Sequence, residues 1–334
     1  MVLVTGATGL LGSHLLYFLL IEGKEVKALV RDLGNVKKIK SVFSYYNAEH
    51  LFDKIKFAEG DVCDFFSIVE ALIDVKQVYH CAALVSFDDD DYALLYKANV
   101  EGTANVVNAC LEKQIKLCHV SSVAALGEAK ENNLVNEKDS WTSSNKKSAY
   151  SITKFNAERE VWRGIEEGLD AFIINPTLII GPGNWGSSSS NMIISAYKGM
   201  RFIMPGITGF VDVRDVAQLA IKLMDKDVKK ERYILSENNH SFVDFYKHAS
   251  KSFEKKAPSL FVSRTLVNIG VQFLNFTKLF GNKPQITASG VASAFNKKYF
   301  DNAKVLKLTG WKFIPLNESV AFACEKYLQE IKQN

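Results

Sequence analysis

The sequence has few cysteines, and no two of them form a CxxC motif. Its 334 residues include five, and no two stand in a CxxC arrangement. Their odd number and apolar neighbours argue against a disulfide framework and indicate buried thiols in a reducing compartment. The five are Cys63, Cys81, Cys110, Cys118 and Cys324.

Long hydrophobic runs and basic blocks are also missing. No uncharged stretch reaches the ~18 residues of a membrane span. An apolar strand begins directly after Met1, which leaves no room for a signal or transit peptide, so we expect a cytoplasmic protein. The net charge of +4 is spread over lysine-rich segments. We therefore expect no nucleic-acid partner.

The sequence offers little to bind a metal ion. None of the six histidines stands at ligand spacing with another. The acidic run Asp88–Asp91 invites a metal interpretation, but four adjacent acids cannot all face one ion from a regular element. They precede a helical segment, whose N-terminus favours negative charge. We predict no metal site.

Apolar segments alternate with stretches long enough for crossover helices. With 47% apolar residues, the chain can build two layers of helices around a sheet plus a smaller cap. The rhythm predicts an α/β fold with a parallel, doubly wound sheet. The expected strands are Val2–Thr5, Glu25–Val30, Ile55–Ala58, Gln77–Cys81, Ile115–Val120 and Ala171–Ile174.

The rhythm breaks after Gly181 in a Gly/Ser/Asn stretch that is typical of a substrate loop, although idle connections share this composition. A helical pattern at 211–225 and a strand at Tyr233–Leu235 then return to the first domain. We therefore predict a dinucleotide-binding domain at 1–177 with a return segment at 208–236. Residues 178–207 and 237–334 form the predicted substrate lobe, which is smaller and mostly helical.

The first strand ends in three glycines spaced by two residues, Gly6, Gly9 and Gly12, and passes into a helical segment at Ser13–Ile21. Such a turn can press its backbone against a pyrophosphate, to which the helix N-terminus offers free N–H groups. Alone, the triplet could equally be a tight turn.

A second group of residues can move a proton. Tyr150 and Lys154 are four apart, so on a helix they share a face, where the ammonium favours the phenolate. Ser121 and Ser122 follow a predicted strand, at the edge where sites on open α/β sheets lie. Each feature alone is common on solvated helices and in turns. The ordered set is much harder to obtain by chance.

These residues resemble the extended branch of the short-chain dehydrogenase/reductase superfamily, the NAD-dependent epimerase/dehydratase family. The match covers nearly the whole chain, with a Rossmann fold implied. The matching segments are TGATGLLG at 5–12, GDVCD at 60–64, HCAALVSF at 80–87, NVEGTANVV at 99–107, VSSVAALG at 120–127, YSITK at 150–154, NPTLIIGPG at 175–183 and FVDVRDVA at 210–217.

The resemblance implies a role for each matching residue. Ser122 binds the carbonyl, Tyr150 donates or accepts the proton, Lys154 binds the nicotinamide ribose and lowers the tyrosine pKa, and Asn99 supports the proton relay. Asp61 contacts the adenine, and the backbone of Ala82 and Ala83 packs along the cofactor. The remaining expected cofactor-binding residues are Thr5, Gly6, Thr8, Gly9, Leu10, Leu11, Gly12, Val62, Pro176 and Thr177.

The end of the second strand bears on the choice between NADP and NAD. NAD-preferring relatives carry an acid where this chain has Val30, and here the acid is displaced to Asp32. Arg31 can make a bidentate phosphate contact. The stretch at 31–40 resembles the same region of dihydroflavonol reductases, where a later lysine also approaches the phosphate; in this chain that lysine is Lys38. Alternatively, Arg31 stacks on adenine or faces water. We predict NADP as the cofactor, with NAD possible.

Local departures from the family pattern favour reduction of a ketone or aldehyde, or oxidation of the alcohol. Val123, Ala124 and Ala125 replace the Asp-Glu pair that dehydratases use for elimination. The Pro176-Thr177 form is closer to carbonyl reductases than to epimerases. An NAD-dependent sugar-nucleotide epimerase and a non-catalytic NADP-sensing regulator are the alternatives. Retention of the Tyr/Lys pair argues against the regulator.

The segment Leu260–Phe280 is amphipathic, with Arg264, Asn268, Gln272, Asn275 and Lys278 on one face. It is predicted to cover an apolar pocket or pack the cap; contact with a membrane surface is the alternative, as in hydroxysteroid dehydrogenase relatives. A homodimer is also possible. The expected partner is a small carbonyl or alcohol substrate.

Overall fold

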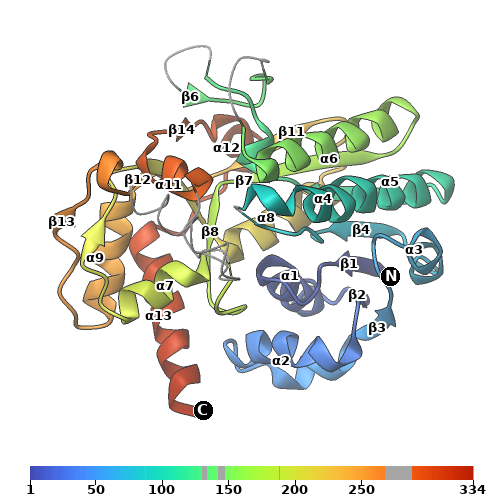
Figure 1. The fold of residues 1–334 in the computed structure, drawn as a ribbon. Coiled ribbons are helices and arrows are strands. Elements are labelled where there is room, and N and C mark those ends of the chain that lie inside the picture. The colour runs from blue at the N-terminus through green and yellow to red at the C-terminus, as the bar shows by residue number, and fades with distance from the viewer. Residues whose placement is uncertain (87, 130–133, 142–146, 188, 268–287, 334) are drawn as a thin grey trace.

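The computed structural model of the chain describes residues 1–86, 88–129, 134–141, 147–187, 189–267 and 288–333. Its centre is a seven-stranded parallel sheet in the order β11-β7-β5-β4-β1-β2-β3 (Figure 1). The strands are β1 (Val2–Thr5), β2 (Val26–Val30), β3 (Lys56–Glu59), β4 (Gln77–His80), β5 (Lys116–Val120), β7 (Ala171–Pro176) and β11 (Arg232–Leu235). All of the predicted strands are therefore confirmed, with small shifts at their ends.

Helices cover both faces of this sheet, because successive strand residues point to opposite sides and both sides are apolar. Val4 and Cys118 belong to one buried cluster, while their neighbours Leu3 and Leu117 belong to another. Helices α1 (Leu10–Ile21), α2 (Lys37–Ser44) and α8 (Val213–Asp225) cover the first face. Helices α3 (Phe65–Ala71), α5 (Gly102–Glu112) and α6 (Ala149–Glu166) cover the second. The doubly wound Rossmann architecture is thus confirmed.

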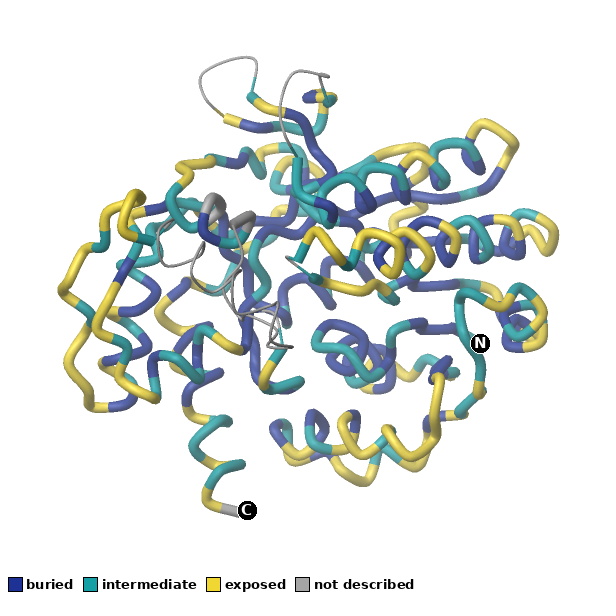
Figure 2. Tube along the Cα trace, in the orientation of Figure 1, coloured by how far each residue is buried: buried dark blue, intermediate teal, exposed yellow. Residues whose placement is uncertain are grey.

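The chain order reverses at β1, which has β2 on one side and β4 on the other. Crossovers leave in opposite directions from this point, so a crevice opens beyond the carboxyl ends of the strands. Figure 2 shows the buried chain running through the central strands, with exposure concentrated on the outer helices. The fold therefore positions a site next to the glycine turn.

A smaller lobe is built on a second sheet. Strand β10 (Ile207–Asp212) pairs in parallel with β8 (Leu178–Ile180) and antiparallel with β12 (Asn238–Ser241). Helices α7 (Ser190–Tyr197), α9 (Phe242–Ser252) and α13 (Leu316–Gln333) pack around its buried residues (Figure 1, left). Thus, of the predicted return segment, α8 and β11 join the large fold while β10 belongs to the lobe sheet.

Short elements complete the described chain. They are α4 (Tyr92–Leu95), α11 (Ala288–Phe295), α12 (Ala303–Thr309), β6 (Leu134–Val135), β9 (Phe202–Ile203), β13 (Leu260–Phe261), β14 (Tyr299–Phe300), the π-helix η4 (Tyr96–Glu101), and the 3₁₀ turns η1 (Leu33–Val36), η2 (Glu49–Lys54), η3 (Asp89–Asp91) and η5 (Val123–Ala125). Asp88 caps η3, consistent with the predicted helix-start role of the acidic run. Of the predicted amphipathic segment, residues 268–280 lie outside the described residues.

The start of α1 and the burial of two cysteines differ from what the sequence predicted. Helix α1 starts at Leu10, three residues earlier than predicted, because Gly12 is part of its first turn. Of the five free cysteines, Cys63 and Cys81 are only partly buried. Among the described residues, no helix is long and apolar enough to cross a bilayer, and no group of His, Cys, Asp and Glu is arranged to hold a metal ion.

Candidate active site

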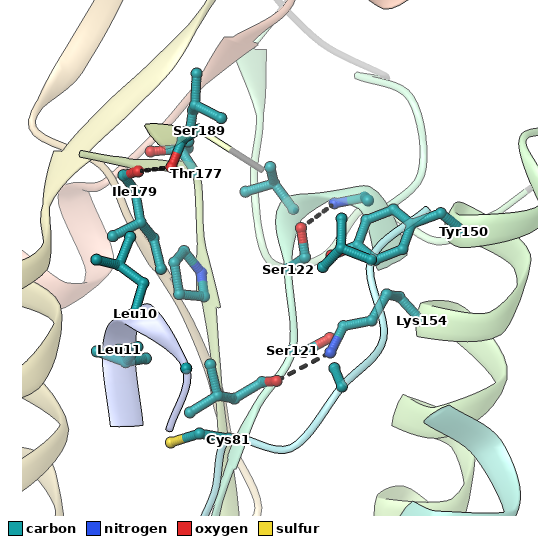
Figure 3. Close-up of a pocket in the computed structure, with 18 of the residues that line it drawn as sticks. Leu10, Leu11, Cys81, Ser121, Ser122, Tyr150, Lys154, Thr177, Ile179 and Ser189 are labelled. Carbon is teal, nitrogen blue, oxygen red and sulfur yellow. Dashed lines mark hydrogen bonds between the residues drawn. The ribbon is translucent and has the colours of Figure 1, made fainter. Parts of the chain in front are cut away.

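A cavity of about 420 Å³ opens at the carboxyl edge of the large sheet, between that sheet and the lobe. This volume lies within the range of small-molecule sites. Figure 3 shows Leu10 and Leu11 on one side, with Ser122, Tyr150 and Lys154 on the other. The predicted site residues that line it are Gly6, Gly9, Leu10, Leu11, Gly12, Ala83, Ser122, Tyr150, Lys154, Pro176 and Thr177.

The glycine turn is built so tightly that side chains would not fit. Gly6 has a φ of +65°, and a Cβ there would lie 2.6 Å from the Ala82 nitrogen. A Cβ on Gly12 would lie 2.2 Å from the Gly6 oxygen. The absence of these side chains lets the backbone and the start of α1 border the cavity directly, as a dinucleotide pyrophosphate requires. The turn therefore fits the predicted cofactor.

Tyr150 and Lys154 lie one turn apart on α6, which starts at the capping residue Ser148. The Tyr150 and Ser122 side chains are hydrogen-bonded. Lys154 Nζ donates to the Val120 carbonyl oxygen over 3.0 Å (Figure 3). The helix and the end of β5 thus bring together a hydroxyl pair and a cation that are far apart in the sequence.

Burial has the largest effect on the pKa values of Tyr150 and Lys154. It raises the pKa of Tyr150, and the hydrogen bond with Ser122 acts in the opposite direction. The predicted lowering of the tyrosine pKa is therefore not seen in the protein alone, because burial outweighs the stabilisation of the phenolate. Burial also lowers the pKa of Lys154 to about 8, while the Glu158 carboxylate and then Cys81 oppose this effect. A protonated Tyr150 is suited to give a proton.

Asn99 lies in the π-helix η4 behind this group, outside the cavity lining. Its side chain accepts from the Leu84 backbone N–H over 2.7 Å and donates to the Leu84 carbonyl and to Thr153 on α6. Asn99 therefore joins the segment after β4 to the helix that carries Tyr150. A π-turn in a helix has no simple periodic signature, so the sequence predicted the residue but not its setting.

A buried histidine, His80, links these parts. His80 Nδ1 lies 2.8 Å from Thr5 Oγ1, and Nε2 lies 3.0 Å from Thr103 Oγ1. Thr5 Oγ1 accepts from the Ala82 N–H, and Thr103 Oγ1 donates to the Asn99 carbonyl. The bonds form one directional series only if His80 carries its proton on Nε2. Burial, the larger effect, and Lys154 lower the pKa of His80 to about 3.

The remaining predicted cofactor residues lie outside the cavity lining. Thr8 belongs to the glycine turn, and Val62 accepts a hydrogen bond at its carbonyl from Asn105. Asp61 Oδ1 accepts from the Cys63 N–H, which fixes its turn after β3. Arg31 and Lys38 are exposed, beyond the end of β2 and on α2. The structure does not bring these residues into the cavity lining.

Some cavity residues were missed by the sequence. Thr208, Asn296, Lys298 and Phe300 reach the cavity from the lobe. Segment 296–300 is held there because the Lys298 N–H donates to the Ile207 carbonyl of β10. Residues about 90 positions apart meet here, because the Ile207 N–H also donates to the Asn296 carbonyl over 3.0 Å. No local sequence pattern predicts this pairing. By contrast, the predicted loop after Gly181 does border the cavity, through Gly183, Asn184, Ser187, Ser189 and Ser190.

Comparison with known proteins agrees with this geometry. The family model described as "NAD dependent epimerase/dehydratase family" matches residues 2–236. The chain is 33% identical over 239 residues to "Sterol demethylase protein B" of Methylococcus capsulatus, covering 70% of this chain and 69% of that protein. It is 28% identical over 336 residues to a "Putative dihydroflavonol 4-reductase" of Synechocystis, covering 96% and 92%.

Solved structures give the same fold. The crystal structure of gox2253 superposes with a TM-score of 0.81 at 28% identity, covering 99% of this chain and 98% of that one. Yeast methylglyoxal/isovaleraldehyde reductase Gre2, complexed with NADPH, superposes with a TM-score of 0.71 at 21% identity, covering 100% and 99%. The second likeness concerns the fold alone.

Proposed function

The chain belongs to the NAD-dependent epimerase/dehydratase family, and from this premise we propose that it is an NADP(H)-dependent reductase of a ketone or aldehyde, or oxidises the alcohol. It is an NAD(P)-dependent oxidoreductase of the extended short-chain dehydrogenase/reductase type. The observation that carries the finer proposal is the meeting of Ser122, Tyr150 and Lys154 beside the glycine turn in one cavity.

The proposed chemistry uses each of these side chains. The bound nicotinamide supplies the hydride. Ser122 and Tyr150 donate hydrogen bonds to the substrate oxygen, so that the charge that develops there is stabilised. Tyr150 then gives its proton to that oxygen, and the Lys154 ammonium orients the ribose and favours the tyrosinate that remains. Thr208, Asn296 and Phe300 border the space beyond Tyr150, where we place the substrate.

Several relatives of this chain are named as reductases. Relatives with names of this class include tetraketide alpha-pyrone and anthocyanidin reductases. Their substrates guide the choice of compounds for a screen. The division at 1–177 and 208–236, the cytoplasmic location, the homodimer and the absence of a nucleic-acid partner remain predictions.

We expect NADPH oxidation with a carbonyl compound such as methylglyoxal, isovaleraldehyde or a dihydroflavonol. The epimerase alternative is tested with UDP-glucose as the substrate. The protein then carries only the NAD it already binds, and no cofactor is added. Conversion of UDP-glucose without net change in cofactor would instead support the epimerase alternative. NADPH binding without turnover on any carbonyl, alcohol or sugar nucleotide would revive the sensing alternative.

Tyr150→Phe tests the mechanism, because it removes one hydroxyl and keeps the ring. Turnover on the compound found in the screen should fall by ~10²–10⁴-fold, as for a positioned acid, while NADPH affinity stays near normal. Lys154→Ala should lower both turnover and NADPH affinity, because the ammonium also orients the ribose. Near-normal hydride transfer by Tyr150→Phe would contradict the role of Tyr150 even if the fold is right.

A further inference from the structure

A buried carboxylate lies one turn beyond Lys154 and has no assigned role. Glu158 follows Lys154 by four residues on α6, so Tyr150, Lys154 and Glu158 lie along one face of the helix. Only 2% of the Glu158 side chain is exposed, although a carboxylate is rarely buried so completely. Burial at this depth requires partners, and they lead to the site.

Both oxygens of Glu158 are engaged. Oε1 pairs with Arg232 Nη1 of β11 over 3.2 Å. Oε2 accepts from Ser121 Oγ over 3.1 Å and from Asn175 Nδ2 over 3.2 Å. The carboxylate thus ties α6 to β7, to the first residue of β11 and to the turn that directly follows β5.

Asn175 carries the connection to Ser122. Its Nδ2 also donates to the Ser122 carbonyl oxygen over 3.0 Å. Both partners of Nδ2 are acceptors, which fixes the orientation of the amide. The amide therefore anchors the backbone of the serine whose hydroxyl meets Tyr150, and Glu158 anchors the amide.

Several charged or titratable groups face Lys154. Glu158 and Tyr150 lie on its own helix, His119 on β5, and His80 and Cys81 at the end of β4. Burial and Lys154 keep the pKa of both histidines low, so these rings are neutral. Among the groups in this cluster, Glu158 therefore supplies the counter-charge to the ammonium at neutral pH.

We propose that Glu158 is a positioning residue: its carboxylate holds the Ser121–Ser122 turn through Asn175 and supplies the negative charge that faces the Lys154 ammonium. This inference rests on the proposed function, since it assigns Glu158 to the same reaction. Glu158 touches neither cofactor nor substrate and acts through Lys154 and Ser122.

Glu158→Gln tests the charge with little change in shape. Without the anion, Lys154 should lose its proton at lower pH, so the alkaline loss of NADPH affinity should move by about one pH unit toward acid. Titration of NADPH by calorimetry between pH 7 and pH 10 measures this without a substrate. The alkaline limb of turnover should move by the same amount, and Glu158→Asp should restore both midpoints.

Glu160→Gln is the matched control, because Glu160 lies on the same helix but pairs with Arg163 over 2.9 Å on another face. It should leave both midpoints unchanged. A Glu158→Gln protein with the wild-type midpoints, or with affinity and turnover lowered equally at every pH, would overturn the charge assignment.

Asn175→Ala tests positioning even if Glu158→Gln does not fold. It should lower kcat by about 10-fold, with KM and NADPH affinity near normal, because Ser122 is no longer held in place. Unchanged kcat would overturn the positioning role. If Tyr150→Phe keeps full hydride transfer, the proposed reaction fails. If Tyr150→Phe is inactive but Glu158→Gln behaves like Glu160→Gln, only this inference fails.

Discussion

The residue pair after β2 shows how one shifted position changes what a side chain can bind. Asp32 Oδ1 accepts from the Gly34 N–H over 2.7 Å, and Oδ2 accepts from Asn35 Nδ2 over 2.8 Å. Both oxygens are therefore used to cap η1. In the described part of the chain, the guanidinium of Arg31 has no ion-pair partner and is exposed beside this cap. The Asp32 carboxylate is therefore occupied by the cap, whereas the Arg31 guanidinium remains available for a 2′-phosphate.

Arg31→Ala should therefore weaken NADPH by about 10-fold or more and leave NADH nearly unchanged. A charge-assisted phosphate contact contributes ~1.5–3 kcal/mol, and NADH has no 2′-phosphate to lose. Calorimetric titration of both cofactors measures the difference. Lys40→Ala is the control, because Lys40 lies over the Phe52 ring, 5.9 Å from its centroid. Equal affinities of the unchanged protein for NADPH and NADH would rule out the NADP preference.

At the scale of elements, the sequence predicted those parts of the fold that have a local cause. The strand from Val2 to Thr5 follows from an apolar run. The turn after it follows from its glycines, because its backbone conformation and close contacts leave no room for side chains. The positions of Tyr150 and Lys154 follow from helical periodicity. The bond from Asn175 to Ser122 could not be predicted, because the two residues are 53 apart in sequence and no local pattern pairs them.

The C-terminal helix gives a second example. Glu330 on α13 accepts from Trp185 Nε1 over 2.6 Å and from the Tyr45 hydroxyl over 2.5 Å. Burial and this carboxylate raise the pKa of Tyr45, so its hydroxyl stays protonated and can donate. Trp185 stands in the loop that brings Asn184 and Ser187 to the cavity. One carboxylate thus joins the last helix, α2 and the cavity loop.

Glu330→Gln should reduce the free energy of unfolding by about 1–3 kcal/mol, because two hydrogen bonds to a charged acceptor are weakened. We expect KM for the substrate to rise more than the Kd of NADPH, since the loop borders the cavity beyond the glycine turn. Thermal unfolding and steady-state kinetics measure the two effects. Glu325→Gln on the exposed side of α13 should change neither. Equal losses in both variants would contradict the role of Glu330.

At the scale of the whole molecule, a buried histidine links the two halves of the chain, and two more lie within the dinucleotide half. His14 Nε2 donates to the Pro182 carbonyl over 2.9 Å, and Nδ1 then accepts from the Tyr46 hydroxyl over 2.7 Å. His14 lies in α1 and Pro182 in the loop that follows β8, so the bond links the dinucleotide half to the lobe side. His80 and His119 are likewise buried, at the ends of β4 and β5.

These rings make the stability of the whole molecule depend on acid. Burial, the largest effect, lowers the pKa of His14 to about 4 and that of His80 to about 3, and it lowers that of His119 well below 6.5. In the unfolded chain the rings take up protons near pH 6.5, whereas in the fold they do not. The unfolded state therefore binds more protons below pH 6.5, and stability falls as the pH falls.

Three carboxylates act against this trend, because burial raises the pKa of Glu22, Glu137 and Asp215. Burial raises the pKa of Asp215 to about 6, despite hydrogen bonds from Ile314 and Trp311. Between its ordinary 3.8 and about 6, the folded state holds a proton that the unfolded state has released, so Asp215 stabilises the fold as the pH falls through this window. The three buried histidines, together with Asp244, whose pKa the hydrogen bond with Ser241 lowers, leave acid destabilisation as the net result.

We therefore expect the free energy of unfolding to fall by about 1–3 kcal/mol per pH unit below pH 6.5. Denaturant unfolding at closely spaced pH values between 7 and 4.5 measures this slope. His14→Gln keeps a donor for Pro182 but cannot titrate, so its slope should be smaller by about 1.4 kcal/mol per pH unit, the value of one proton. The exposed His50→Gln should keep the full slope. A His14→Gln protein with the wild-type slope would show that His14 is not neutral in the fold.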